Sequence, residues 1–156
     1  MKIPDKADWE EAWTGLDEAS AFQNFYGKTL KEALRLFEDC ALIYQEDLVY
    51  MPETAFKYYV RAYIHYLASE RSRGDSDGAN CFIGLMKTRL RDHPNWLSGS
   101  WRQIELVLRR IADHQEDFFD AKHSIYGDFR KKVESLIEQQ AKAQHGEDGK
   151  AQPAIS

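Results

Sequence analysis

The stretch that most constrains the fold begins at Pro52 and carries five aromatic residues before Arg71. Proline suits the first turn of a helix, because the N–H that it lacks would have no partner there. Beyond it, apolar side chains recur every three or four residues, which places them on one stripe of a helix. We therefore expect a helix over residues 52–71 with neighbours on more than one side. The stripe consists of Phe56, Tyr59, Val60, Tyr63 and Leu67, widened by Ala62 and Tyr66.

The far side of this helix carries Tyr58, Arg61 and His65. Each of these side chains has an apolar body and a polar tip, so the three can line a binding surface or form a second packing face. Packing is the more frequent role for such residues. We keep both interpretations and treat the three as candidate partner-binding residues.

A second helix is predicted immediately upstream. Thr29 and Glu32 have the T-x-x-E spacing of a capping box, in which the two side chains satisfy N–H groups at a helix start. The helical period of apolar residues then continues to Tyr44. Residues 45–51 are too few for more than a tight connector. This helix and the helix over residues 52–71 should therefore form an antiparallel hairpin.

Three further helices follow from the apolar spacing. They are expected over residues 79–91 with Asp77 as N-cap, from Ser98 or Ser100 to about residue 120, and over residues 124–140. Residues 144–156 show no period and should form a disordered tail. The sequence thus predicts an all-α, single-domain bundle of about five to six helices in antiparallel hairpins over residues 1–143.

Composition narrows the classes of function. A chain of 156 residues with a formal net charge of -5 suits one domain, and the acidic balance argues against binding duplex nucleic acid. An acidic domain is better matched to a basic protein. We expect a cytoplasmic protein, because no apolar run approaches a membrane span and residues 1–13 lack the apolar core of a signal peptide. Cys40 and Cys81 lie among apolar neighbours and should be buried, reduced thiols.

The densest group of acidic side chains lies near residue 115. Asp113, Asp117 and Asp120 would share one helix face at i, i+4 and i+7, with Glu116 beside them. Phe118 and Phe119 should take the inner face, which leaves the acids in water. The E-x-x-H pairs of helical metal sites are absent, so we expect no metal ion here. The four acids are therefore candidate partner-binding residues.

A second group of carboxylates flanks the central helix. Glu46 and Asp47 precede it, and Asp75 and Asp77 follow it, which suggests a separation of about 30 Å at 1.5 Å per residue. These acids either serve as caps and turns or form a loop site for a hydrolase or metal-dependent enzyme. The Gly27-Lys28-Thr29 triplet lacks the strand and the earlier glycine of a phosphate loop, and we expect no bound cofactor.

Residues 27–90 resemble a set of small bacterial helical proteins of unknown function. The shared pattern is GK[ST]xxEAxxxF, then YQEDL, then AFx[FY]Y, then SxxxGDSD. The matching residues are Gly27, Lys28, Thr29, Glu32, Ala33, Phe37, Tyr44, Gln45, Glu46, Asp47, Leu48, Ala55, Phe56, Tyr58, Tyr59, Ser69, Gly74, Asp75, Ser76 and Asp77. Proteins of this type are often suspected of being immunity proteins that neutralise toxins, so the resemblance implies that kind of role.

These observations favour a protein-binding module without catalytic activity, of the immunity type, which binds a basic partner through Asp113, Glu116, Asp117 and Asp120. The alternative is a small hydrolase or metal-dependent enzyme that uses the loop carboxylates. A third interpretation, a homodimeric scaffold, rests on the high aromatic content.

Overall fold

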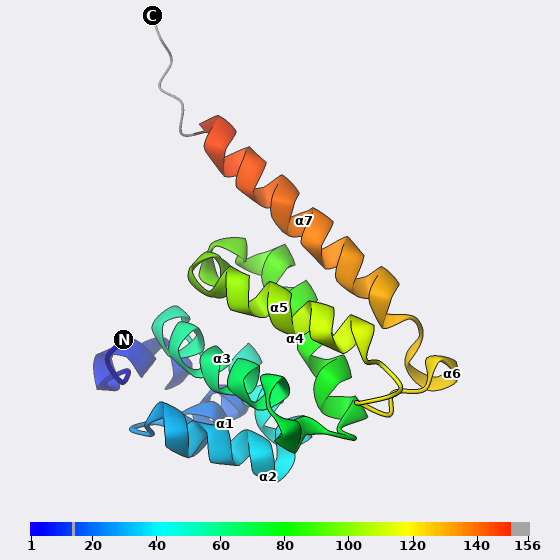
Figure 1. Cartoon of the computed structure of the whole chain (residues 1–156). Coiled ribbons are helices and arrows are strands. Elements are labelled where there is room, and N and C mark those ends of the chain that lie inside the picture. Colours follow the sequence, from blue (N-terminus) through cyan, green and yellow to red (C-terminus); the bar gives the residue numbers. More distant parts are fainter. Residues whose placement is uncertain (14, 151–156) are drawn as a thin grey trace, which may run out of the picture.

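The computed structural model describes residues 1–13 and 15–150. Within these ranges the chain forms α-helices and short 3-10 helices and no strand, which confirms the predicted all-α class (Figure 1). The helices are η1 (Lys6–Trp13), α1 (Leu16–Phe25), α2 (Leu30–Val49), α3 (Glu53–Ala68), η2 (Glu70–Ser72), α4 (Ser76–Asp92), η3 (Pro94–Ser100), α5 (Trp101–Asp113), α6 (His123–Tyr126) and α7 (Phe129–Lys150).

Helix α3 lies in the centre of the bundle, as its apolar stripe predicts. It packs against α2 on one side and α5 on the other, while α4 and α7 complete the bundle. Phe56, Tyr59, Tyr63 and Leu67 are fully buried. The Tyr63 ring stacks on Phe37 with 4.9 Å between centroids, and such aromatic pairs add to the energy of area burial.

Helices α2 and α3 form the expected antiparallel hairpin, but their connector is shorter than predicted. Thr29 begins α2 by accepting a hydrogen bond from the backbone N–H of Glu32 at 3.1 Å. The helix then continues to Val49, so the expectation of a connector over residues 45–51 is wrong. Arg89 explains the extension, because its guanidinium donates to the carbonyls of Leu48 and Val49 at 3.1 and 2.6 Å and satisfies the end of the helix.

Helices α2 and α4 run side by side in the same direction. Near their beginnings, the Tyr63 ring contacts both Phe37 of α2 and Phe82 of α4, with centroids 4.9 and 5.1 Å away. Near their ends, Arg89 of α4 reaches the carbonyl of Leu48 on α2. The two helices are therefore parallel along the length between these contacts.

Three predicted boundaries differ in the second half. Asp75, not Asp77, caps α4, because its Oδ1 accepts the Gly78 N–H at 2.9 Å. The helix expected to reach residue 120 ends at Asp113. Gly127, with φ of +76°, separates α6 from α7, and α7 runs on to Lys150, into the segment expected to form a disordered tail. The rest of the expected tail, residues 151–156, lies outside the described residues.

Two expectations from composition can be compared with the structure. Cys40 and Cys81 are free thiols, but both are partly exposed rather than buried. Cys40 has φ of -160° and ψ of 89°, so it marks a kink inside α2. No helix in the described part of the chain is long and apolar enough to cross a membrane.

Candidate functional site

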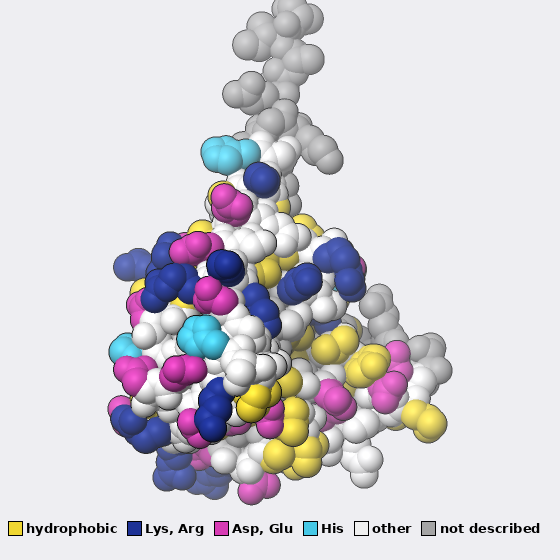
Figure 2. Space-filling model, turned by 90° about the vertical axis from the view of Figure 1, so that its right-hand side faces the viewer, with side chains coloured by type: hydrophobic (Ala, Val, Ile, Leu, Met, Phe, Trp, Pro, Cys, Tyr) yellow, Lys and Arg dark blue, Asp and Glu magenta, His cyan; other side chains and the backbone are white. Residues whose placement is uncertain are grey.

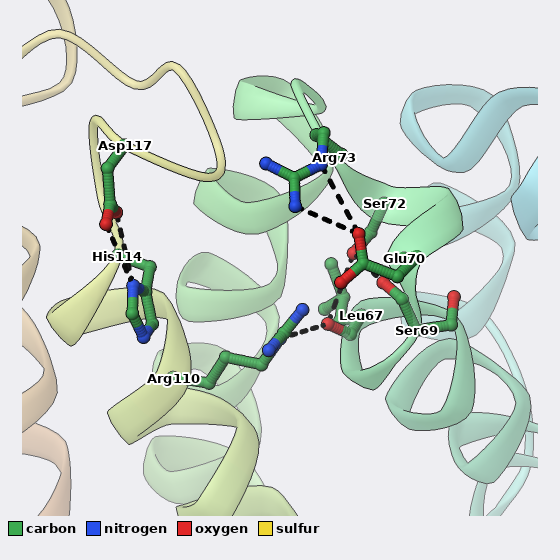
Figure 3. A network of polar contacts seen from close by, with 8 residues as sticks. All are labelled: Leu67, Ser69, Glu70, Ser72, Arg73, Arg110, His114 and Asp117. Carbon is green, nitrogen blue, oxygen red and sulfur yellow. Dashed lines mark hydrogen bonds and ion pairs between the residues drawn. The ribbon is translucent and has the colours of Figure 1, made fainter.

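Two acidic segments that are distant in sequence meet at one end of the bundle. The Gly74 N–H donates to the carbonyl of Phe118 at 2.8 Å. The guanidinium groups of Arg73 and Arg110 lie 4.5 and 4.3 Å from the centroid of the Phe118 ring, and the side chain of Phe118 is buried. Figure 3 shows Arg73 and Arg110 beside the His114–Asp117 pair. We call residues 70–77 and 113–128 together the acidic corner.

A second contact joins the same segments through α6. The hydroxyl of Tyr126 donates to Oδ1 of Asp77 at 2.8 Å and also lies 2.9 Å from the hydroxyl of Ser76. Both partners belong to the first turn of α4. The acidic corner is therefore held together at its middle by Phe118 and at its edge by Tyr126.

A buried glutamine shapes the turn that follows α5. Gln115 is 5% exposed, and its amide donates to the carbonyls of Ala121 and Gly127 at 3.0 and 2.7 Å. Its oxygen accepts the Phe129 N–H at 2.9 Å. The backbone leaves the helix in this turn, because Asp120 has φ of +54° and the Ala121 N–H donates to the carbonyl of Gln115. The expectation that Asp113, Asp117 and Asp120 share a helix face is therefore wrong. Phe118 and Phe119 are nevertheless buried, as predicted.

The two segments of the acidic corner carry an excess of acids equal to the net charge of the chain, before Arg110 and Arg130, which contact them from outside, are counted. The corner contains eight acidic residues and three Lys or Arg residues, an excess of five acids. The full sequence has 26 acidic and 21 basic residues, which is the same excess. The remainder of the molecule is thus balanced in charge. The acids are Glu70, Asp75, Asp77, Asp113, Glu116, Asp117, Asp120 and Asp128.

Histidines hold two of the predicted partner-binding acids in place. His123 Nδ1 lies 3.0 Å from Glu116, and His114 Nδ1 lies 3.1 Å from Asp117. These side-chain hydrogen bonds lower the pKa of Glu116 and of Asp117, so both stay ionised to a lower pH. Asp113 pairs with Arg130 at 3.0 Å. All of these groups are exposed, so the pairs orient the acids but add little stability.

Figure 2 shows the side of the molecule on which α6 lies in Figure 1. Acidic, basic and histidine side chains are mixed over one half of this face, and hydrophobic side chains gather on the other half. A shallow hollow of about 300 Å³ lies in the corner, between the turn after α5 and the start of α7. Its lining includes Glu116, Asp117, His123 and Asp128.

The carboxylates of the predicted loop site have structural partners. Asp47 is 6% exposed and accepts hydrogen bonds from Asn24 at 2.8 Å and Ser20 at 3.3 Å, which tie α1 to α2. Burial raises its pKa, and the two hydrogen bonds oppose that shift. Asp75 caps α4 and accepts the Tyr66 hydroxyl at 2.6 Å. Asp47 and Asp75 thus join helices to one another.

The loop carboxylates belong to two helices that pack side by side, with Glu46 and Asp47 near the end of α2 and Asp75 and Asp77 at the start of α4. Burial raises the pKa of the Cys81 thiol, and the negative charges of Asp77, Asp75 and Glu46 raise it further. Glu46 itself is exposed.

The candidate residues on α3 divide between packing and surface. Tyr58 is 5% exposed and lies beneath the Arg61 guanidinium, 5.2 Å from the ring centroid, so it belongs to a packing face. His65 is exposed and Arg61 is partly exposed. Both border a separate hollow of about 360 Å³ whose wall includes Ser100 and Gln103.

The residues that build the acidic corner include several that the sequence pattern does not indicate. Arg73, Arg110, Gln115 and Tyr126 act through contacts that span up to 50 residues, and no local spacing predicts such contacts. Within the described ranges, no three His, Cys, Asp or Glu side chains are placed to hold a metal ion together. Comparison with family models, curated proteins and solved structures finds no match to this chain, so the resemblance of residues 27–90 stays a prediction.

Proposed function

We propose that this protein is a binding module whose acidic corner holds a basic surface of another protein. The observation that carries the proposal is the location of the charge: the excess of acids in the corner equals the net charge of -5 of the full sequence. A concentrated negative field attracts a basic surface and orients it before contact.

The construction of the corner suits recognition without large rearrangement. Phe118 fixes the turn after α5 between Arg73 and Arg110, and Tyr126 ties α6 to α4. A loop that is already ordered loses little conformational entropy when a partner binds. The exposed acids Glu116, Asp117 and Asp120 remain at the surface, where a partner's Lys and Arg side chains can reach them.

The biological class that we propose is an immunity-type inhibitor that neutralises a basic toxin. Support comes from the acidic field and from the resemblance of residues 27–90 to small bacterial proteins. The hydrolase alternative receives less support, because Asp47, Asp75 and Asp77 accept hydrogen bonds from Asn24, Tyr66 and Tyr126 that hold helices together. We therefore advance the binding role alone.

The test is a comparative affinity capture from lysate of the native host. Three baits are compared: the wild type, the neutralised variant Glu116→Gln/Asp117→Asn/Asp120→Asn, and a control variant with three exposed acids changed elsewhere. The control is Asp39→Asn/Glu134→Gln/Glu138→Gln, which removes the same charge outside the corner.

We expect the wild type and the control to retain the same basic protein and the neutralised variant to lose it at moderate salt. Capture of the same proteins by all three baits, or of no protein by any, would contradict the proposal. Circular dichroism of each bait verifies that the helices remain intact.

A further inference from the structure

A groove lined by basic side chains, opposite in charge to the acidic corner, lies between α4 and α7. Its volume is about 420 Å³, within the range of pockets that hold small ligands. Ile83 and Leu136, which are 5% and 3% exposed, form an apolar floor. Among the described residues that line the groove, none is acidic and three are lysines: Lys87, Lys131 and Lys132.

The lysines are largely free to meet a ligand. Lys87 and Lys131 form no ion pair with any described residue, although the chain has more acids than bases. Lys132 also lines the groove, and its ammonium group donates to the carbonyl of Tyr126 at 2.7 Å. Positive charges that lie near one another repel, and an anion between them would relieve the repulsion.

A glycine in the middle of α4 keeps the groove open. Gly84 is exposed and has no positive φ, and a Cβ atom built on it meets nothing within 4 Å. Neither backbone conformation nor close packing requires glycine there, although glycine inside a helix is less stable than alanine. Any larger side chain would project into the groove, since Gly84 is part of its wall.

We propose that this groove binds a small organic phosphate monoester, with the phosphate between the lysines and the apolar body on Ile83 and Leu136. Lysine is a strong point-charge partner for phosphate, and a monoester carries nearly two negative charges at neutral pH. Asn80, Ser135 and Gln139 at the groove supply neutral donors for the remaining oxygens. This site is separate from the acidic corner and serves a ligand of opposite charge.

The experiment adds each probe in steps to the full chain and monitors binding through the amide chemical shifts in two-dimensional NMR spectra. The probes are phenyl phosphate, phenyl sulfate with the same shape and one charge fewer, and inorganic phosphate without the ring. A peptide of six glutamates serves as a model of an acidic protein segment. The variants are Lys87→Gln/Lys131→Gln and Gly84→Leu, and Lys142→Gln is the control because Lys142 is an exposed lysine on α7 outside the groove.

For phenyl phosphate we expect saturable shifts confined to the walls of the groove, with weaker binding of the other three probes. The double lysine variant should bind about tenfold more weakly or worse. Gly84→Leu should remain folded and lose binding, while Lys142→Gln should behave as the wild type.

The proposal is overturned if phenyl phosphate gives no saturable shifts. It is also overturned if shifts appear around every exposed lysine and Lys142→Gln weakens binding as much as Lys87→Gln/Lys131→Gln does. Equal affinity for phenyl sulfate would refute the phosphate assignment. Tighter binding of the glutamate peptide would assign the groove to an acidic protein segment instead.

Discussion

The Tyr126 hydroxyl donates a hydrogen bond of 2.8 Å to the carboxylate of Asp77, a residue 49 positions earlier in the chain. This bond and the Gly74–Phe118 contact bring segments 70–77 and 113–128 together. The acidic corner is therefore a product of tertiary structure. Its negative field depends on these contacts, because the two segments would otherwise be free to separate.

The clamp at Tyr126 can be tested directly. Tyr126→Phe removes the hydroxyl that bonds to Asp77 and Ser76, so we expect faster amide hydrogen exchange in the first turn of α4 and in α6, with the rest of the bundle unchanged. Tyr50→Phe is the matched control, because Tyr50 is exposed and its hydroxyl has no bonded partner among the described residues. Unchanged exchange in α6 after Tyr126→Phe would show that this bond does not hold the corner.

Arg89 should be essential to the end of α2. The residue is 5% exposed, and its guanidinium bonds to the carbonyls of Leu48 and Val49 and lies over the rings of Phe56 and Trp96. Arg89→Leu leaves those carbonyls without their donor, so we expect a loss of about 2–3 kcal/mol in the free energy of unfolding.

Urea unfolding measures that loss of stability, and two further variants test whether it is specific to the Arg89 guanidinium. Arg89→Lys should retain only a small part of the stability that Arg89→Leu loses, because an ammonium group cannot lie flat over two rings. Arg91→Leu should have no measurable effect, since Arg91 is exposed and pairs only with its neighbour Asp92 among the described residues. If all three variants unfold alike, Arg89 does not support the end of α2.

Asp47 should give stability a defined dependence on pH. Burial raises its pKa above 3.8 in the folded protein, so the folded state holds this proton more tightly than the unfolded chain does. By linkage, the stabilising contribution is complete below pH 3.8 and is lost as pH rises through the raised pKa.

An asparagine at this position cannot titrate. We therefore expect the unfolding free energy of the wild type, minus that of Asp47→Asn, to fall as pH rises from about 3.5 toward 7. Urea titrations at several pH values measure this difference. A difference that grows with pH would mean that folding lowers the pKa of Asp47.

Gly84 should be replaceable without loss of stability. Because a Cβ atom there meets open space, Gly84→Ala should raise the free energy of unfolding by about 0.5–1 kcal/mol. Gly78 is the matched contrast, since a Cβ atom on it would collide with the Asp75 carboxylate that caps α4. Gly78→Ala should therefore destabilise the protein by about 1–2 kcal/mol. Thermal unfolding of both variants settles whether Gly84 is required for the fold.

The sequence predicts those features that depend on local physical chemistry. The stripe from Phe56 to Leu67 predicts the central position of α3, because its spacing alone determines which side chains must be buried. Thr29 predicts the start of α2, because capping involves neighbours in the chain. The hydrophobicity of Phe118 and Phe119 likewise predicts that both side chains are buried.

The features that the sequence does not predict depend on distant partners. Helix α2 extends to Val49 because Arg89, 40 residues later, supplies the missing donor. Helix α5 ends at Asp113, and the turn beyond it is held by the side chain of Gln115, which bonds to the carbonyls of Ala121 and Gly127. The meeting of the two acidic segments follows from contacts between Gly74 and Phe118 and between Asp77 and Tyr126. No periodicity within either segment encodes these contacts.

The central claim is tested most directly by the association rate constant between this protein and the captured basic partner, measured by stopped flow from about 50 to about 500 mM NaCl. For the wild type and for Asp39→Asn/Glu134→Gln/Glu138→Gln, we predict fast association at low salt that slows steeply as salt rises. For Glu116→Gln/Asp117→Asn/Asp120→Asn, we predict slower association with a much flatter dependence. Identical rates and identical salt dependence for all three proteins would contradict the assignment of partner binding to the acidic corner.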